Sequence, residues 1–391
     1  MHDTLVGELR LQVESENRAS GNETKWWRML RYQPGTRVTD RSTYKWQPTT
    51  AEIAQRFNLL ESQIVRFDHN TTANDTTWVT GMISPLARDL NEYPGASYRS
   101  LRVAAASYLD TAASNIVPGA GIDELIDLTA KAFLGPGRRA CAVVPTYPLY
   151  EIATVQHRAE FLPVAEPRFD MFPVDEITEA AETSEVTWLC VPNNPTGERV
   201  DNDVIKSVIA SAKGIVVIDA AYAEFVGDRW TRWVDRYPNL LVLHTMSKAF
   251  GLAGIRVGFG FGHADLVAEL EHVRPPGSIS TLSHLLAEQA LSEPQRMERT
   301  VMATIKERES LAQALSAAGL SVVPSTANFL LCHLGPSARG LADTLLMEGL
   351  VVRSYPEAHP LNEFLRFTVR SPSENQRLIA ALRSRVGIYL S

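Results

Sequence analysis

Cysteine, long apolar runs and basic clusters are scarce in this sequence of 391 residues. Its three cysteines, Cys141, Cys190 and Cys332, are too few and too scattered for a disulfide framework or a zinc site. The nine histidines show no ligand spacing, so we expect no metal. No apolar stretch approaches the roughly 20 residues of a membrane span, and the first residues lack the pattern of a signal peptide, so we expect a cytoplasmic protein. A net charge of -7 without a dense basic stripe argues against nucleic acid as a partner.

What the sequence does have is an apolar content of 45%, enough for a large core and two domains. Short apolar runs that are typical of strands alternate with helical stretches from about residue 96 to 275. The predicted strands are Ala140–Val144, Val186–Val191, Ile215–Asp219, Leu240–His244 and Arg256–Phe261. This alternation predicts an α/β fold with a mainly parallel sheet between helices.

The sequence also predicts how the chain divides into domains. Residues 1–43 would form an N-terminal arm, in which Trp26 and Trp27 pack rather than bind, and residues 96–285 the large domain. Residues 44–95 would supply the N-terminal part of a small domain and an interdomain segment, and residues 286–391 the rest of that domain. Its predicted elements are a long helix from about Gln295 to Ala318 and strands at Phe329–Cys332, Val351–Arg353 and Leu365–Val369.

One segment carries most of the functional information. Lys248 follows the predicted strand Leu240–His244, with Thr245 and Ser247 before it and Arg256 eight residues later. Pyridoxal 5'-phosphate (PLP) needs an amine for its Schiff base and cations and donors for its phosphate, and this segment offers both. The alternative is a lysine on the surface of a helix, the usual place of this residue type.

Two strand ends add polar groups to this interpretation. Asn194 precedes a proline in Val191-Pro-Asn-Asn-Pro-Thr-Gly197, so its amide can point from the loop at a ligand, although such residues also form plain turns. Asp219 ends an apolar run that is typical of a buried parallel strand, and ligands lie beyond the carboxyl ends of such strands. An aspartate there can keep a pyridinium nitrogen protonated, and the alternative is the N-cap of a helix.

A third segment suits a phosphate group. Glycines open Pro118-Gly-Ala-Gly-Ile-Asp-Glu-Leu-Ile126, and apolar residues then recur at helical spacing from Ile122 to Phe133. A glycine turn at the start of a helix presents free backbone N–H groups and the positive end of the helix dipole, which together favour an anion.

In this chain order, the segments resemble those of the PLP-dependent aminotransferases of fold type I. The run Ser247-Lys-Ala-Phe-Gly-Leu-Ala-Gly-Ile-Arg256 is most similar to that of the histidinol-phosphate aminotransferase branch, and the likeness extends from about Tyr44 to about Ile388. The resemblance implies a large domain with a mainly parallel sheet, a smaller α/β domain, and a homodimer with shared active sites. It also implies transfer of an amino group between an amino acid or amino-phosphate and a 2-oxo acid.

The resemblance gives each matching residue a role. Lys248 would be the Schiff-base lysine and Asp219 the partner of the pyridine nitrogen, while Tyr222 and Asn194 would hydrogen-bond the ring 3'-oxygen and Tyr147 would stack on the ring. The phosphate would meet Gly121, Ile122, Asp123, Thr245, Ser247 and Arg256, together with Tyr93, a position that in this family reaches the phosphate of the neighbouring subunit.

On the substrate side, the resemblance implicates Arg353 and Arg366, with Asn328 and Tyr44 in the same region. The two arginines would hold the acidic end of the substrate, which is a phosphate in the histidinol-phosphate branch. A planar guanidinium grips such groups through two parallel hydrogen bonds. The alternative for an arginine in such a strand is a surface ion pair worth about 1 kcal/mol or less.

The substrate side also departs from the family pattern. Where an Asn-Glu-Asn-Pro run is common, this chain has Asp68-His-Asn-Thr-Thr72; it has Asp219-Ala-Ala-Tyr222 instead of Asp-Glu-Ala-Tyr, and Arg370 in place of a small residue, which would add a cation near the substrate mouth. These departures leave open a relative that acts on another amino acid, or an α-decarboxylase of the threonine-phosphate type. A non-catalytic PLP-binding or regulatory module is a further alternative, for which the sequence shows no appended DNA-binding domain.

Overall fold

The computed structural model describes residues 44, 47–73, 76–86, 90–95, 97–165 and 172–384. The predicted arm over residues 1–43, with Trp26 and Trp27, lies outside the described residues. Tyr44–Ser391 forms a unit of its own. Among the helices of the described part, none combines the length and the apolar character needed to cross a membrane.

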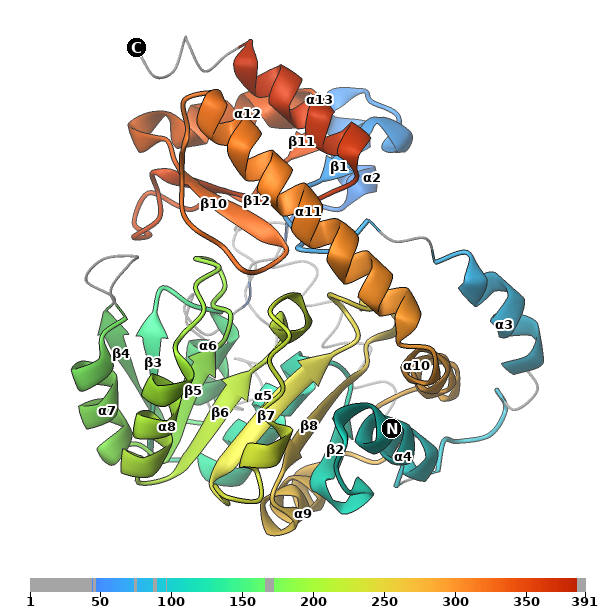
Figure 1. Ribbon diagram of the computed structural model, residues 1–391, viewed down its shortest axis with the longest axis vertical. Coiled ribbons are helices and arrows are strands. Elements are labelled where there is room, and N and C mark those ends of the chain that lie inside the picture. Colours follow the sequence, from blue (N-terminus) through green and yellow to red (C-terminus); the bar gives the residue numbers. More distant parts are fainter. Residues whose placement is uncertain are drawn as a thin grey trace, which may run out of the picture. The chain divides into compact units, whose positions relative to one another are not determined.

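A seven-stranded sheet is the centre of the larger part of this unit (Figure 1). In spatial order its strands are β2 (Ile116–Gly119), β8 (Gly258–Gly262), β7 (Leu240–Thr245), β6 (Ile215–Asp219), β5 (Val186–Cys190), β3 (Arg139–Val144) and β4 (Glu160–Ala165). The run from β7 to β4 is parallel, β8 is antiparallel to both of its neighbours, and the sheet is therefore mainly parallel as predicted. Strand β8 begins two residues later than predicted because Arg256 has a left-handed backbone, with φ at 53°.

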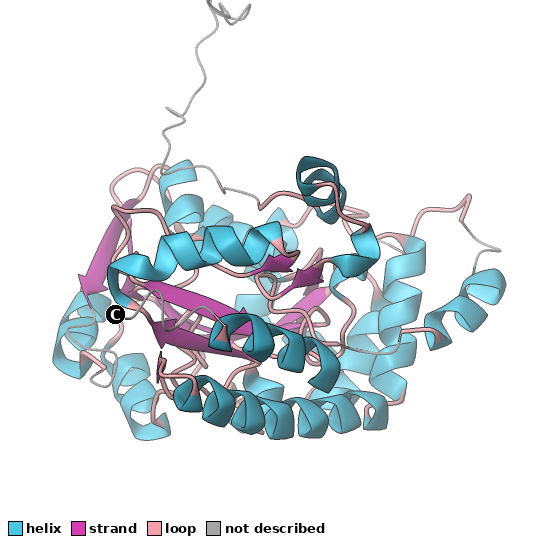
Figure 2. Cartoon of the chain, turned by 90° about the horizontal axis from the view of Figure 1, so that it is seen from above, coloured by secondary structure: helices cyan, strands magenta, loops and turns pink. Residues whose placement is uncertain are grey.

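The strands are apolar because helices cover both faces of the sheet, as the views in Figures 1 and 2 show. All residues of β5, β6, β7 and β8 are buried. The covering helices are α5 (Ile122–Phe133), α6 (Leu149–Gln156) and α9 (Ala264–Val273) on one face and α7 (Val174–Glu182) and α8 (Asn202–Ser211) on the other. The crossovers β3-α6-β4 and β4-α7-β5 run in opposite directions along the sheet, and right-handed connections therefore place α6 and α7 on opposite faces.

The carboxyl ends of the central strands lie side by side. Cys190 at the end of β5 pairs with Asp219 at the end of β6, and Asp219 pairs with Leu243 near the end of β7. In open α/β sheets this edge is where ligands bind, because the loops that follow parallel strands all leave from it. The residues that follow β6 and β7 are therefore neighbours in space.

Two small sheets and three helices form a second hydrophobic core. Strand β10 (Phe329–His333) is antiparallel to β12 (Phe364–Thr368) and to β9 (Ser321–Val322), while β1 (Val65–Arg66) is parallel to β11 (Leu350–Val351). The helices of this core are α11 (Gln295–Ala317), α12 (Ala338–Met347) and α13 (Pro372–Arg383). Helix α2 (Thr50–Phe57) precedes β1 in the chain and buries Ile53 and Ala54. Because Val65 and Phe67 pack in this core, a segment near the start of the described chain belongs with its C-terminal part; the predicted domain boundaries themselves stay predictions.

Helix α11 connects the two cores. Its buried Met297 and Val301 pack in the core around the large sheet, and its buried Leu311 and Leu315 pack in the smaller core. It ends one residue before the predicted limit. The remaining helices are α3 (Trp78–Leu86), α4 (Arg99–Leu109) and α10 (Thr281–Ser292), and α10 contacts both of the others.

Candidate active site

Lys248 lies in the loop after β7 and is partly buried. Its Nζ donates a hydrogen bond to the His69 carbonyl oxygen at 3.1 Å and lies 5.9 Å from the centre of the Tyr222 ring. Burial, followed by the nearby Arg366 cation, lowers the pKa of Lys248 to about 8. A larger fraction of the amine is therefore neutral at pH 7 than for an ordinary lysine, and the neutral form is the one that attacks a carbonyl carbon. The alternative of a lysine on a surface helix does not hold.

Asp219 ends β6 and is 3% exposed. Its Oδ2 accepts a hydrogen bond from the Tyr150 hydroxyl at 2.6 Å, and its Oδ1 accepts one from the Ala221 backbone N–H at 3.1 Å. Burial raises the pKa of the carboxyl to about 6, against the opposing effect of the Tyr150 hydrogen bond. Asp219 is not a helix N-cap, because the next helical residues are the short 3-10 turn Ala223–Phe225, which is preceded by Tyr222.

Tyr222 and Asn194 flank the same edge of the sheet. The Tyr222 hydroxyl accepts a hydrogen bond from Asn70 Nδ2 at 3.0 Å, so its proton remains for another acceptor. Burial raises the pKa of this phenol, which keeps the proton in place at neutral pH. Asn194 Oδ1 accepts a hydrogen bond from Arg366 Nη1, which leaves the Asn194 NH2 group as a donor. The Tyr222 hydroxyl and the Asn194 NH2 group are thus both available to donate a hydrogen bond to an oxygen atom of a ligand.

The start of α5 forms an anion cradle with Arg256. Gly121, the residue before the helix, has φ at 83°, and a Cβ at this position would lie 2.8 Å from Arg256 Nη2. A Cβ at Gly258 would lie 2.9 Å from the Ile122 nitrogen. Only glycine permits these approaches, so the free N–H groups of the helix start and a guanidinium face the same space.

Side chains from three loops surround this cradle. Arg256 Nη2 lies 3.1 Å from Asp123 Oδ2, and the Tyr147 hydroxyl donates to Asp123 Oδ1 at 3.0 Å. Thr245 Oγ1 accepts from the Ser247 N–H at 3.1 Å and donates to Ser247 Oγ at 3.0 Å. With Lys248 and Asp219, the predicted residues thus supply an amine, a buried acid, hydroxyl donors and an anion cradle, the set of groups that PLP requires.

Arg353 and Arg366 lie opposite each other in an antiparallel bridge. Each backbone N–H donates to the other's carbonyl oxygen, at 3.1 and 2.9 Å, so both side chains leave the same face. Arg366 is buried, lies 5.2 Å from the Phe329 ring centre, and has no partner for its Nε among the described residues. Arg353 lies 5.8 Å from the Tyr355 ring centre, and within the described chain its guanidinium makes no hydrogen bond or ion pair.

The sequence analysis missed the role of the backbone at residues 68–70. Three successive carbonyl oxygens accept hydrogen bonds there: Asp68 from Arg366 Nη2 at 2.7 Å, His69 from Lys248 and Asn70 from Asn328 Nδ2 at 3.0 Å. The only signal in the sequence was the departure from the family pattern at this segment. A backbone carbonyl is present at every position, so residue type carries no information about this role.

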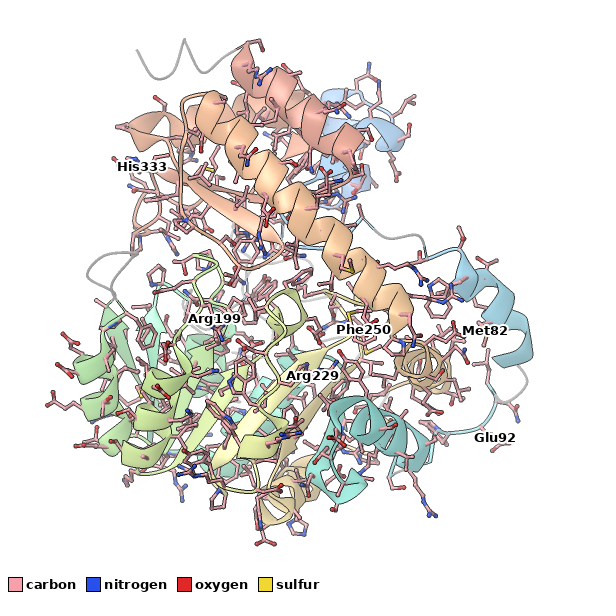
Figure 3. All side chains as sticks on the ribbon, viewed as in Figure 1. Met82, Glu92, Arg199, Arg229, Phe250 and His333 are labelled. Carbon is pink, nitrogen blue, oxygen red and sulfur yellow. The ribbon has the colours of Figure 1, made fainter. Side chains whose placement is uncertain are left out.

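The other predicted residues lie in different surroundings. Asn328 is buried, and its amide holds the Asn70 backbone. Arg370 pairs with Glu374 at 3.1 Å and donates to the Thr71 carbonyl oxygen at 3.1 Å, so its expected extra charge is compensated. The Tyr44 ring lies 6.4 Å from the Tyr147 ring. Tyr93 is 95% exposed and follows Glu92, which lies on the connection between α3 and α4 (Figure 3).

Two further predictions concern metals and cysteines. In the described ranges, no group of three or more histidine, cysteine, aspartate or glutamate side chains could hold a metal ion. Cys141 and Cys190 are free and buried, as predicted for core residues, and Cys332 is buried as well. Tyr150 and Asn70, which contact Asp219 and Tyr222, did not follow from the sequence motifs.

Comparison with known proteins shows the family to which the chain belongs. The family described as aminotransferase class I and II matches residues 62–382. A histidinol-phosphate aminotransferase from Caldanaerobacter subterraneus subsp. tengcongensis is 34% identical over 342 residues, which cover 85% of this chain and 97% of that protein.

Solved structures share the fold at lower identity. The structure of histidinol-phosphate aminotransferase from Sinorhizobium meliloti in complex with PLP has a TM-score of 0.81 and 22% identity, covering 91% of this chain and 99% of that chain. The structure of L-threonine-O-3-phosphate decarboxylase from Porphyromonas gingivalis has a TM-score of 0.73 and 22% identity, covering 83% of this chain and 100% of that chain. The match at sequence level, together with the site geometry, identifies the chain as a member of the class I and II aminotransferases, PLP-dependent enzymes of fold type I, in their histidinol-phosphate aminotransferase branch.

Proposed function

We propose that this aminotransferase takes its amino group from a donor that carries a phosphate or a second acidic group, as histidinol phosphate does, and passes it to a 2-oxo acid. The observation that carries this proposal is the Arg353–Arg366 pair, whose guanidinium groups leave one face of the small sheet. Two guanidinium groups on one face favour an anion that can accept several charge-assisted hydrogen bonds. The name of the similar protein from Caldanaerobacter agrees with such a donor.

The residues of the chain divide the work of the reaction. PLP, when bound, supplies the electron sink that stabilises a carbanion at the substrate Cα. The Lys248 amine, with its lowered pKa, is the base that takes the Cα proton from the amino donor and, in the second half of the cycle, delivers a proton to Cα of the 2-oxo acid. Asp219 holds the ring nitrogen protonated, and Arg366 orients the acidic substrate while it also bonds Asn194.

We further propose a homodimer in which Tyr93 serves the neighbouring active site. An exposed fraction of 95% for this aromatic residue supports the idea that it lies against another molecule. Tyr93→Phe should then raise the concentration of PLP needed for half-saturation in a dimer, and should have no effect on a chain that sedimentation shows to be monomeric. The cytoplasmic location stays a prediction from the sequence.

An α-decarboxylase acting on an amino-phosphate is the second candidate. It is favoured by the altered substrate rim at Asp68–Thr72 and by the shared fold with the Porphyromonas gingivalis enzyme. The two reactions differ in which bond of the substrate Cα breaks, and the paired arginines suit both.

One experiment separates the candidates. Wild-type enzyme with PLP is incubated with histidinol phosphate, histidinol, threonine phosphate and a panel of amino acids, with 2-oxoglutarate as acceptor, and both the amino acid product and carbon dioxide are measured. We expect amino transfer from histidinol phosphate and little from histidinol. Carbon dioxide release from threonine phosphate without amino transfer would favour the decarboxylase. Turnover of neutral amino acids alone would contradict the acidic-donor proposal.

A further inference from the structure

Tyr150, on α6, reaches the acid at the end of β6. Its hydroxyl donates to Asp219 Oδ2 at 2.6 Å, and its side chain is completely buried. The ring is held on two sides: it stacks on Trp188 with ring centres 5.2 Å apart and planes 6° from parallel, and it meets the Tyr147 ring edge-on at 5.8 Å. The hydroxyl therefore has a fixed direction, with little freedom to leave the carboxylate.

The direction of this hydrogen bond is also fixed. Burial, with the Asp219 charge adding to it, raises the pKa of the Tyr150 phenol well above its ordinary value. The phenol therefore keeps its proton at neutral pH, and Asp219 is the acceptor. A carboxylate accepts such a bond more strongly than a carboxylic acid does, so the bond favours the charged form.

Few other groups favour a charge on Asp219. Among the described residues, the Ala221 N–H is the other hydrogen-bond donor to the carboxylate, and Lys248 is the cation that acts on it. Asp123 and burial act in the opposite direction. The titratable and charged groups that face Asp219 from the elements around it are Tyr150 and Tyr147 on and before α6, Cys190 on β5, Asp123 on α5, Tyr222 after β6 and Lys248 after β7.

We propose that Tyr150 is a positioning residue: its hydroxyl orients the Asp219 carboxylate and keeps it in the charged form that can hold a pyridinium proton. Tyr150 touches neither substrate nor cofactor in this role and acts through Asp219. With Oδ2 engaged by Tyr150 and Oδ1 by Ala221, the carboxylate plane is set before any ring is bound. The proposal rests on the cofactor chemistry of the family, and it is independent of which amino donor the enzyme uses.

The test measures the titration of the Asp219 carboxyl in the apoenzyme, so its result does not depend on the activity of the PLP-bound enzyme. The protein is prepared with ¹³C-labelled aspartate, the Asp219 carboxyl signal is assigned by its loss in Asp219→Asn, and its titration is followed by NMR in wild type and Tyr150→Phe. Losing one hydrogen bond to a charged group should raise the titration midpoint by about one to two pH units. From the value of about 6, the Asp219 carboxyl of Tyr150→Phe would then be between about half and nine-tenths neutral at pH 7.

A matched control is Tyr108→Phe, which removes the hydroxyl of a buried tyrosine on α4 in the same core. It should leave the titration of Asp219 unchanged. An Asp219 midpoint in Tyr150→Phe that lies within about 0.3 units of wild type, or an equal shift in Tyr108→Phe, overturns the proposal. If Tyr150→Phe does not fold, 3-fluorotyrosine at position 150 replaces it: a more acidic phenol donates more strongly, so the midpoint should fall, and a rise or no change overturns the proposal.

The holoenzyme gives a second readout. In Tyr150→Phe the acid limb of the kcat–pH profile should move to higher pH by about the amount seen for Asp219, with little change in KM. Combining Tyr150→Phe with Asp219→Asn should cause no further loss of kcat beyond that of Asp219→Asn. Independent, multiplicative losses would mean that Tyr150 acts by another route and would overturn the proposal.

Discussion

Replacing Arg353 with glutamine is the sharpest test of the substrate proposal. Of the two paired arginines, Arg353 is the one whose guanidinium makes no hydrogen bond or ion pair within the described residues; its contact there is with the Tyr355 ring, 5.8 Å away. Its removal therefore breaks few internal contacts, and the folded structure should persist. The change removes the charge and the planar fork and leaves a shorter, neutral polar side chain.

The expected size of the effect follows from the contact that is lost. A charge-assisted hydrogen bond contributes about 1.5–3 kcal/mol, so losing the hold of Arg353 on an acidic group should lower kcat/KM roughly 10- to 100-fold. A neutral analogue never makes this contact, so its kcat/KM should change by less than about threefold. Arg353→Lys keeps the charge and loses the planar fork, so its kcat/KM for the acidic substrate should lie between those of wild type and Arg353→Gln.

The assay compares kcat/KM for histidinol phosphate and histidinol in wild type, Arg353→Gln and Arg353→Lys, with PLP saturation checked in each variant. The ratio of the two substrates is the quantity to follow, because it cancels any general damage to the enzyme. If Arg353→Gln lowers kcat/KM equally for both substrates, the arginine does not contact the acidic group and the reasoning is refuted. A preference for histidinol in the wild type would refute it as well.

Three further predictions concern other residues of the site. Arg366→Gln should lower kcat/KM for neutral substrates as well as for acidic ones, and more for the acidic ones, because this guanidinium also donates to Asn194 and to the Asp68 carbonyl oxygen; a loss confined to acidic substrates would contradict these contacts. The pKa of Asp219 is about 6 in the folded protein and ordinarily 3.8, so burying its ionised carboxylate lowers the free energy of unfolding. This destabilisation is absent below pH 3.8, grows between pH 3.8 and about 6, and is complete above about 6. Urea unfolding should thus find Asp219→Asn apoenzyme more stable than wild type at pH 8, by up to about 3 kcal/mol, and equal near pH 4; equal stability at both pH values would speak against the raised pKa. Borohydride reduction of the holoenzyme should place the pyridoxyl label on Lys248, and Lys248→Ala should bind PLP without turnover, whereas a label on another lysine would exclude the assignment.

The secondary structure and the cofactor chemistry were predictable because their signals are local. Apolar runs of four to six residues mark β5, β6 and β7, since a strand buried on both faces has no polar alternation. The residues that follow such strands are brought to one edge of the sheet by the parallel arrangement itself. Lys248 and Asp219 could therefore be placed near each other from their positions after two strands.

The anion cradle was predictable for a similar reason. Gly121 stands directly before a stretch of helical periodicity. The start of any helix presents free backbone N–H groups and the positive end of the helix dipole, whatever its surroundings in the fold. The approach of Arg256 to Gly121 spans more than 130 residues of sequence, and it was expected only from the likeness to a known family.

The sequence by itself thus determined the elements, the edge of the sheet that holds the site and the chemistry of its main groups. Only the tertiary structure decided which groups support them: the Tyr150 hydroxyl on Asp219, the carbonyl oxygens of residues 68–70 on Lys248, Arg366 and Asn328, and the bridge that sets Arg353 beside Arg366. These contacts join residues that lie far apart in the chain, and most use a backbone atom or a common hydroxyl. Such atoms leave no pattern in a sequence, because which atoms they contact depends on how distant segments of the chain pack together in the folded protein.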